Sequence, residues 1–273
     1  MAESTLSVSC TEVKGNQVIQ RADVLAVEQP LEIRLVSGPV SSRTQKTVSV
    51  TMRTPGQDEA LASGFLITEG IIPAIEAIAS VNLIAESDGS VAVIELHPET
   101  EVNLQQADRN FYTTSSCGVC GKTSIEAVMH AGGIVSSDLK IEAGVIKRMP
   151  DELRKAQPVF EQTGGLHASG LFYPDGTIRL VCEDVGRHNA LDKLIGTALR
   201  SGLEFENHVV ALSGRISFEL VQKAVVAGIP VLVAVGAPSS LAVQLAEQSN
   251  ITLCGFAGQA RFNIYTHPER ILF

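Results

Sequence analysis

The strongest constraint on the fold is a series of short, almost wholly apolar segments near the C-terminus, separated by stretches with helical periodicity. Three such segments, residues 209–212, 231–235 and 251–253, alternate with helical patterns over residues 217–227 and 239–248. Apolar strands joined by amphipathic helices form parallel sheets with right-handed crossovers, because such strands are buried on both faces. The pattern therefore predicts a β-α-β-α-β unit whose sheet is covered by helices on both faces.

A hairpin and one more helix extend this unit toward the N-terminus. Strands are predicted from Leu166 to Phe172 and from Thr177 to Cys182, because the residues between them, Tyr-Pro-Asp-Gly, are typical of a turn. Asn189 is placed to cap the next helix, which Gly202 would end. We expect residues 164–273 to form an α/β region with a mixed or parallel sheet.

The N-terminal part of the chain has the period of strands. Alternating segments between Val8 and Arg53 predict several strands, and Asp58 is a candidate N-cap for a helix that ends near Gly70. A further strand pair is expected between Ile78 and His97. We expect residues 1–110 to form a smaller, β-rich α+β region.

Residues 111–163 are expected to connect these two regions. The stretch 105–122 has no clean period and is rich in small and hydroxyl residues, which favours a loop. Thr123 and Glu126 have the spacing of a capping box, which predicts a helix as far as Ala131. The charged segment 147–158 predicts another, exposed helix.

The charge of the chain limits its partners. With 21 basic and 30 acidic side chains, the net charge is −9, which opposes nonspecific binding to nucleic acid or to an anionic membrane. The first residues lack the basic and apolar regions of a signal peptide, so a cytoplasmic location is expected. Five cysteines are too few and odd in number for a disulfide framework, which favours reduced thiols.

The sharpest chemical feature is the sequence Cys-Gly-Val-Cys-Gly-Lys, with its cysteines at 117 and 120. Such a pair can supply half of a zinc site, act as a redox dithiol or present a nucleophilic thiolate. Zinc would need a distant His or a partner chain, because no second pair of ligands at zinc spacing accompanies this one. Two incidental loop cysteines are a further alternative.

A thiolate that handles sulfur is the interpretation we favour for Cys117 and Cys120. Lys122 and the positive end of the helix predicted at Thr123 would both lower a thiol pKa. Cys120 lies nearer that helix and would be the more acidic thiol, whereas Cys117 would be more accessible. These arguments leave the order of the two thiols open.

A second cluster, Glu-Asp-Val-Gly-Arg-His-Asn at 183–189, lies between a predicted strand and a helix. Arg187 and His188 at a helix N-terminus would make an anion-binding site. The structural alternative is a surface ion pair between Glu183 and Arg187, with His188 flanking the helix.

Two turns after predicted strands repeat this theme. One contains Ser213, Gly214 and Arg215, and the other is Gly-Ala-Pro-Ser-Ser at 236–240. Parallel strands would bring both turns to one edge of the sheet, where their backbone amides could hold a diphosphate. Ordinary tight turns are the alternative. His167, at the start of a strand, is more simply interpreted as a structural histidine.

Four long motifs follow one another along the chain, and together they resemble the FdhD/NarQ family of formate dehydrogenase accessory sulfurtransferases. The resemblance runs from about residue 50 to the C-terminus. The motifs are TSSCGVCGK at 114–122, GGLHA at 164–168, EDVGRHNALDK at 183–193 and SGRISFELVQKA at 213–224.

The resemblance implies a function and partners that the residues alone do not give. It implies that a cysteine desulfurase supplies persulfide sulfur, and that the chain passes it to the bis(molybdopterin guanine dinucleotide) molybdenum cofactor for formate dehydrogenase. Tungsten could replace molybdenum. Cys117 would carry the persulfide and Cys120 would relay or release it. A homodimer, a cytidine-deaminase-like fold in the C-terminal part and no permanently bound metal are also implied.

The resemblance also assigns a cofactor-contacting stretch near the C-terminus. This stretch departs from the family pattern at one position. The pattern places an Arg where this chain has Gly258, and Arg261 could supply the charge instead. The predicted cofactor-binding residues are Phe256, Ala257, Gly258, Gln259, Ala260 and Arg261, with Arg187, His188, Ser213, Gly214 and Arg215 from the other loops.

Two other functions remain as alternatives. The first is a non-enzymatic chaperone that binds the cofactor and uses its cysteines only to grip metal or partner. The second is a zinc hydrolase of the deaminase type, which would need His-x-Glu followed by Pro-Cys-x-x-Cys. The chain contains no Pro-Cys-x-x-Cys to complete that hydrolase signature.

Overall fold

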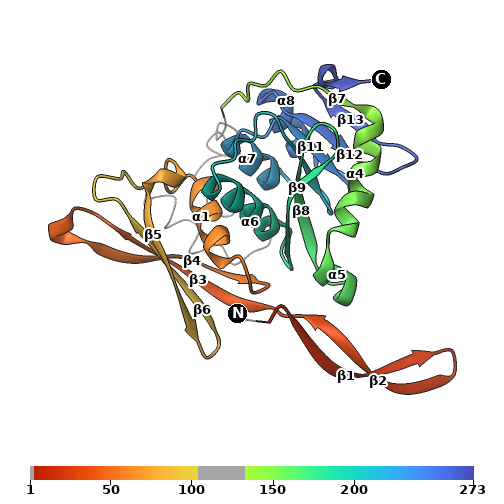
Figure 1. Ribbon diagram of the computed structural model, residues 1–273, viewed down its shortest axis with the longest axis horizontal. Helices are drawn as coiled ribbons and strands as arrows, with labels where there is room; N and C mark the ends of the chain where they lie inside the picture. Colours follow the sequence, from red (N-terminus) through yellow and green to blue (C-terminus); the bar gives the residue numbers. More distant parts are fainter. Residues whose placement is uncertain (1–2, 104–132) are drawn as a thin grey trace.

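A six-stranded mixed sheet forms the C-terminal half of the computed structural model, which describes residues 3–103 and 133–273 (Figure 1). The strand order is β13-β12-β11-β10-β8-β9. The strands β10, β11 and β12 are parallel, as their apolar sequences predict, whereas β8, β9 and β13 pair antiparallel at the two sides. The bounds are β8 His167–Phe172, β9 Ile178–Asp184, β10 Val209–Leu212, β11 Val231–Ala234, β12 Thr252–Gly255 and β13 Asn263–Thr266.

Helices cover both faces of this sheet, because alternate residues of each central strand point to opposite sides. In β10, Val210 and Leu212 belong to one core cluster with α6, α7 and α8, while Val209 and Ala211 belong to another with α4. The helices are α4 Ala143–Lys155, α5 Pro158–Thr163, α6 Arg187–Arg200, α7 Phe218–Ala227 and α8 Ser240–Gln248. A short parallel pair, β7 Ile141–Glu142 with β14 Ile271–Leu272, closes the C-terminus. The α/β fold class is confirmed.

The N-terminal half contains a four-stranded sheet of order β4-β3-β6-β5. Its inward residues, such as Leu31 and Ile33, pack against α1, Asp58–Thr68, and α1 in turn packs against α6. The strands are β3 Gln29–Ser37, β4 Thr44–Arg53, β5 Ile78–Glu86 and β6 Gly89–Leu96, with single 3-10 turns at Val40–Ser42 and Ile75–Ala77; a third 3-10 turn, Pro268–Arg270, precedes β14. The strand pair predicted between residues 78 and 97 is therefore confirmed.

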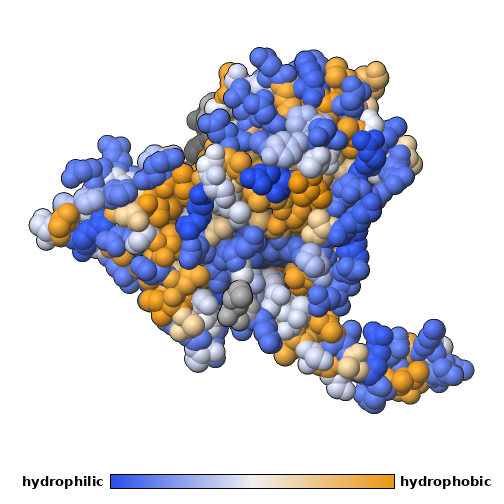
Figure 2. Space-filling model, viewed as in Figure 1, coloured by the Kyte–Doolittle hydropathy of each residue, from blue (hydrophilic) through white to orange (hydrophobic). Residues whose placement is uncertain are grey.

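A separate two-stranded ribbon precedes this sheet. It consists of β1, Thr5–Lys14, and β2, Gln17–Ala26, which pair along their whole length. Figure 1 shows it as a red arm that extends from the body, and Figure 2 shows hydrophobic side chains among the polar ones on it. We call these two strands the arm.

The helices α1 and α6 cross at two glycines. A Cβ atom placed on Gly64 would lie 2.0 Å from the backbone oxygen of Asp192, and one on Gly196 would lie 1.9 Å from that of Ala60. Both distances are far shorter than real Cβ contacts, so only glycine permits this approach. This crossing joins the N-terminal sheet to the C-terminal one.

Several details of the sequence predictions are wrong. Asp58 is the first residue of α1 rather than its N-cap, which is Gln57, and its carboxylate instead pairs with Arg53. Gly186, not Asn189, is the N-cap of α6. The helix predicted over 147–158 begins at Ala143 and buries one face, and a second helix begins at Pro158.

Some predictions fall outside the described residues. These are Cys117, Cys120, the loop around them and the helix predicted from Thr123 to Ala131. The three proposed regions, 1–110, 111–163 and 164–273, stay predictions. Within residues 3–103 and 133–273, no helix is long and apolar enough to span a bilayer.

Candidate functional site

Three turns meet at the carboxyl end of the parallel strands. The backbone N–H of Gly236, after β11, donates to the oxygen of Gly214, after β10, at 3.0 Å. The N–H of Phe256, after β12, donates to the oxygen of Gly236 at 3.1 Å. The turns that the sequence singled out therefore lie side by side, in the place where ligands bind in open α/β sheets.

Gly236 is required for this close approach. A Cβ atom at that position would lie 2.9 Å from the N, Cα and Cγ atoms of Arg215. A larger residue would push the second turn away from the first. The glycine therefore sets the spacing of the turns and keeps Arg215, which is exposed, at their rim.

His167 at the start of β8 joins the same edge. Its ring would be 3.3 Å from a Cβ atom on Gly214, and the neighbouring Ala168 N–H donates to the Ser213 hydroxyl at 2.8 Å. Burial, followed by the charge of Arg187, lowers the pKa of His167, so its imidazole is neutral at pH 7. Sequence reasoning interpreted His167 as a structural histidine, and the structure places it at the same edge as the turns.

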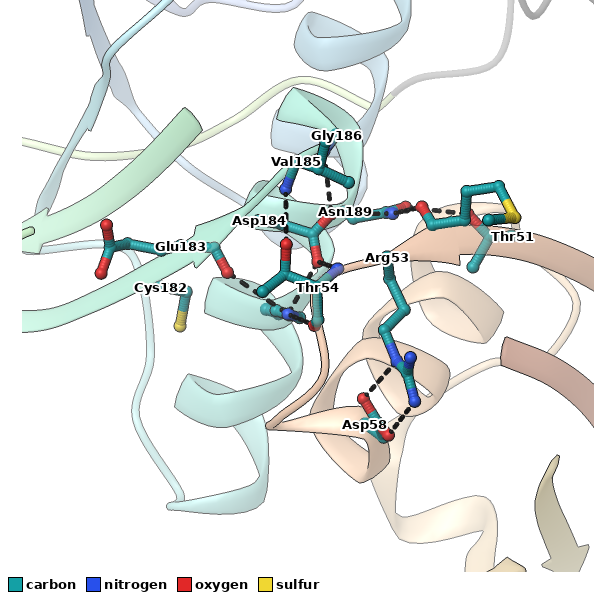
Figure 3. Close-up of polar contacts among 12 residues, drawn as sticks. Thr51, Arg53, Thr54, Asp58, Cys182, Glu183, Asp184, Val185, Gly186 and Asn189 are labelled. Atoms are coloured by element: carbon teal, nitrogen blue, oxygen red, sulfur yellow. Dashed lines mark hydrogen bonds and ion pairs between the residues drawn. The ribbon is translucent and has the colours of Figure 1, made fainter. Parts of the chain in front are cut away.

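The turn that carries Arg187 and His188 is fixed by Asp184 (Figure 3). The Asp184 carboxylate accepts hydrogen bonds from the N–H groups of Thr54 and Gly186 at 3.1 and 2.8 Å. It also accepts one from the Asn189 amide at 3.1 Å and pairs with the ammonium of Lys193 at 2.7 Å. These four contacts hold the N-terminus of α6 beside the three turns.

The expected alternative for this cluster, a surface ion pair, is wrong. Glu183 accepts hydrogen bonds from the N–H groups of Val159 and Phe160, at the start of α5. Arg187 therefore forms no ion pair with Glu183. Its Nε atom is buried and has no hydrogen-bond partner among the described residues, so it is available to a ligand oxygen.

His188 is neutral and contacts a hydroxyl. Its Nε2 atom lies 3.3 Å from the Ser217 oxygen, at the N-cap of α7. Burial lowers its pKa to about 3, and the charges of Lys223 and Arg187 act in the same direction. At pH 7 this imidazole can therefore accept or donate a hydrogen bond but carries no charge.

We expect His188 to make the fold sensitive to acid. Unfolding restores its ordinary pKa near 6.5, so the unfolded chain binds more protons and the free energy of unfolding falls as the pH drops from 6.5 toward 3. Denaturant titrations at pH 7 and pH 5 should give a smaller difference for His188→Gln than for the wild type. His97→Gln, at an exposed position, should leave the difference unchanged, and an unchanged difference in His188→Gln would contradict the assignment.

A cavity of about 480 Å³ opens beside these turns. Its lining combines an apolar majority with a few polar groups, which is typical of sites for small organic ligands. Arg154 also stacks on the Phe160 ring, 3.7 Å from its centroid. The other lining residues are Pro150, Asp151, Leu153, Gln157, Gly164, Gly165, Leu166, His167, Ser213 and Val235.

The predicted cofactor-contacting stretch, residues 256–261, follows β12 and is held by hydrogen bonds within its own backbone. Gly258 and Arg261 exchange backbone hydrogen bonds at 3.0 and 3.2 Å, which places the Arg261 guanidinium 6.0 Å from the Phe256 ring centroid. Gln259 donates to Asp151, a residue that lines the cavity. Ala260 is exposed and Ala257 is buried. The stretch therefore borders the same edge as the turns.

Two of the described cysteines, Cys182 and Cys254, are not suited to nucleophilic chemistry. Cys182 and Cys254 are buried, and burial raises the pKa of both thiols, that of Cys254 to about 12. Cys10 lies on β1, in the arm. In residues 3–103 and 133–273, no three His, Cys, Asp or Glu side chains are grouped to hold a metal ion.

The site combines adjacent turns at the carboxyl end of a mixed α/β sheet with arginines and neutral imidazoles around them. These features define a class of protein suited to binding an anionic ligand at the sheet edge. Comparison with known proteins then gives the family. A model of the FdhD/NarQ family matches residues 26–272, so the chain belongs to that family.

Curated relatives and a solved structure agree with this assignment. The chain is 49% identical over 270 residues to the sulfur carrier protein FdhD of Mycolicibacterium paratuberculosis, covering 96% of both chains. It is 44% identical over 252 residues to that of Picrophilus torridus, covering 92% of both. A crystal structure described as a formate dehydrogenase accessory protein, from Desulfotalea psychrophila, superposes with a TM-score of 0.78 at 25% identity, covering 99% of this chain and all of that one.

Proposed function

We propose that this protein is a sulfur carrier that activates formate dehydrogenase by delivering sulfur to its molybdenum cofactor. The observation that carries the proposal is the sheet edge where three turns meet, with Arg215 on one turn and Arg261 after another. This edge lies next to a cavity of about 480 Å³ whose lining includes Arg154 and His167. Such an edge suits the diphosphates of a bis(molybdopterin guanine dinucleotide) substrate. The names of the relatives support the sulfur-carrier role.

The chemistry begins at Cys117. Its thiolate attacks the outer sulfur of a cysteine desulfurase persulfide, the sulfur–sulfur bond of the donor breaks, and the donor cysteine leaves as a thiolate. Cys117 then holds a persulfide. Attack by the Cys120 thiol on the inner sulfur forms a disulfide between the two cysteines and releases sulfide, which the metal of the cofactor accepts. A thiol reductant afterwards restores both cysteines.

The first test follows the sulfur. After incubation with a cysteine desulfurase and cysteine, the intact mass of the protein should rise by one sulfur atom, and Cys117→Ala should abolish the gain. Cys254→Ala is the matched control, because that thiol is buried with a raised pKa and should leave the gain intact. Sulfur that remains on the Cys117→Ala variant in the same amount would contradict the proposal.

The second test concerns the phosphate contacts, with guanosine diphosphate as the probe. Arg215→Met should weaken binding by about tenfold or more, since a charge-assisted contact to phosphate contributes roughly 1.5–3 kcal/mol. Arg179→Met, an exposed arginine on β9, should bind like the wild type. Calorimetric titration measures both constants. Equal affinities for the two variants would show that Arg215 does not contact the phosphates.

Maturation of formate dehydrogenase separates this proposal from the chaperone alternative. A sulfur carrier requires Cys117, so Cys117→Ala should fail to activate formate dehydrogenase. A chaperone that only binds and delivers the cofactor would support activation in the same variant. The homodimer implied by the resemblance and the cytoplasmic location expected from the first residues are both part of the proposal.

A further inference from the structure

A buried cation lies between three helices, next to the first turn of α6. The ammonium of Lys223, on α7, lies 2.9 Å from the carboxylate of Asp192, on α6, and 2.7 Å from that of Glu69, the C-cap of α1. It also donates to the Thr68 hydroxyl at 2.9 Å. These partners use all three N–H donors of an ammonium, so the cation is fixed relative to the three helices. We call these four residues the Lys223 cluster.

The Lys223 cluster is joined to the candidate site through the same two helices. Asp192 follows His188 by four residues in α6, so the two side chains lie on one face of that helix. Lys223 belongs to α7, and the N-cap of α7, Ser217, contacts the His188 imidazole. The Ser217 hydroxyl makes no capping hydrogen bond to its own helix. The first turns of α6 and α7 are therefore held together by the His188–Ser217 contact and, deeper in the protein, by the Lys223 cluster.

Packing alone does not require a charge at this place. Apolar residues of similar volume often stabilise a protein as well as a buried ion pair does, or better. The helices α1 and α6 already pack directly through Gly64 and Gly196, and α7 contributes Val221 and Ala224 to the apolar cluster that contains α6. A fixed cation between these helices therefore favours a role beyond joining them.

The charge of Lys223 is constant at neutral pH. Burial alone would lower the pKa of its ammonium, but the carboxylates of Asp192 and Glu69 raise the pKa above its ordinary value. Thr68 donates to the second oxygen of Asp192 at 2.7 Å, which fixes that carboxylate as well. The cluster therefore presents a permanent positive charge to its surroundings.

The nearest titratable group of the candidate site is His188, and charges from several elements act on it. After burial, the largest contribution comes from Lys223 on α7, which disfavours the protonated imidazole. Arg187 on α6 and His167 on β8 act in the same direction, whereas Glu69 at the end of α1 favours protonation. Lys223 is therefore the strongest of the charges that keep His188 neutral.

We propose that Lys223 is a positioning residue for the sheet-edge site: it holds the first turns of α6 and α7 together and sets the charge around the His188 imidazole. This inference rests on the proposed function, because it gives Lys223 a part in holding the ligand of that site. A neutral imidazole can accept the hydrogen of the Ser217 hydroxyl through Nε2, whereas an imidazolium can only donate. Lys223 therefore determines which hydrogen bonds the start of α6 can form.

Two substitutions that remove opposite charges separate this role from packing. Lys223→Met should raise the pKa of His188 by about one pH unit or more, because it removes a positive charge and leaves two carboxylates nearby. Glu69→Gln breaks the same ion pair but removes a negative charge, so the pKa of His188 should not rise. A merely structural role predicts a rise in both variants, because a loosened cluster exposes the imidazole to water. NMR of ¹⁵N-labelled histidine rings between pH 4 and 7 measures the titration, and His188→Gln identifies the signal.

A double variant guards against misfolding caused by a lone buried carboxylate. In Lys223→Met combined with Asp192→Asn, that carboxylate is neutral, and the rise in the pKa of His188 should persist because the ammonium is still absent. Both Lys223 variants should bind guanosine diphosphate about threefold or more weakly than the wild type in calorimetric titration at pH 7. Lys155→Met, at an exposed pair, is the matched control and should bind like the wild type.

Three results would overturn the inference: an unchanged pKa of His188 in the folded double variant, an equal rise in Glu69→Gln, or wild-type affinity for guanosine diphosphate in the double variant. Circular dichroism establishes that each variant is folded. The pKa of His188 is measured on ligand-free protein, whereas the sulfur-carrier function is tested by sulfur loading of Cys117. Failure of the positioning role and failure of the proposed function are therefore distinguishable.

Discussion

Replacing Gly196 with alanine should unfold the protein or lower its free energy of unfolding by about 3 kcal/mol or more, the upper end of what overpacking costs. The new Cβ atom would lie 1.9 Å from the backbone oxygen of Ala60 and 2.9 Å from the backbone nitrogen of Gly64. No side-chain rotation relieves a collision with backbone atoms. The helices α1 and α6 would have to separate, and the apolar residues buried between them would lose contacts.

Gly144→Ala is the matched control for this prediction. Gly144 is also helical, but a Cβ atom there meets only the end of the flexible Arg148 side chain, at 3.6 Å. Alanine is favoured over glycine in a helix by up to about 1 kcal/mol, so this variant should be as stable as the wild type or more so. Urea unfolding followed by circular dichroism measures both. Equal stability of Gly196→Ala and the wild type would show that the helices do not cross this closely.

Lys193→Met should also have a large effect, a loss of about 3–5 kcal/mol in the free energy of unfolding, as is typical when one partner of a buried ion pair is removed. The ammonium of Lys193 lies 2.7 Å from the Asp184 carboxylate and 2.8 Å from the Thr54 oxygen. Both charged side chains are buried. The variant would leave the Asp184 carboxylate without its cation, and it would loosen the turn that holds Arg187 and His188.

Two further variants show whether the effect comes from the buried ion pair. Asp184→Asn should cost less in the Lys193→Met background than in the wild type, because the lone buried carboxylate is then neutralised. Lys155→Met removes the lysine of an exposed pair with Glu152 and should leave the unfolding midpoint unchanged. If Lys193→Met is as stable as Lys155→Met, the buried pair does not support the site.

The central sheet could be predicted because its signals are local. The strands 209–212 and 231–234 are continuous apolar runs, and their helices show clear amphipathic periodicity. The side strands were harder, because antiparallel pairing of β8 and β13 with the parallel core depends on tertiary contacts. The meeting of the turns after β10 and β11 could be predicted from the parallel order alone.

The rest of the site depends on contacts between residues far apart in the chain. Asn189 has the residue type of a helix cap, yet its amide donates to the Met52 oxygen, 137 positions away. His167 reaches the site only because β8 pairs with β10. Local patterns contain no information about these long-range partners.

The most direct test of the central claim is a single-turnover chase. Protein loaded on Cys117 with labelled sulfur is mixed with the molybdenum cofactor in its bis(guanine dinucleotide) form, in the absence of desulfurase, and the label is followed by peptide mapping and by mass spectrometry of the cofactor. The account predicts that the label leaves Cys117 and appears in the cofactor. Label that stays on the protein, or that never reaches Cys117, would contradict it.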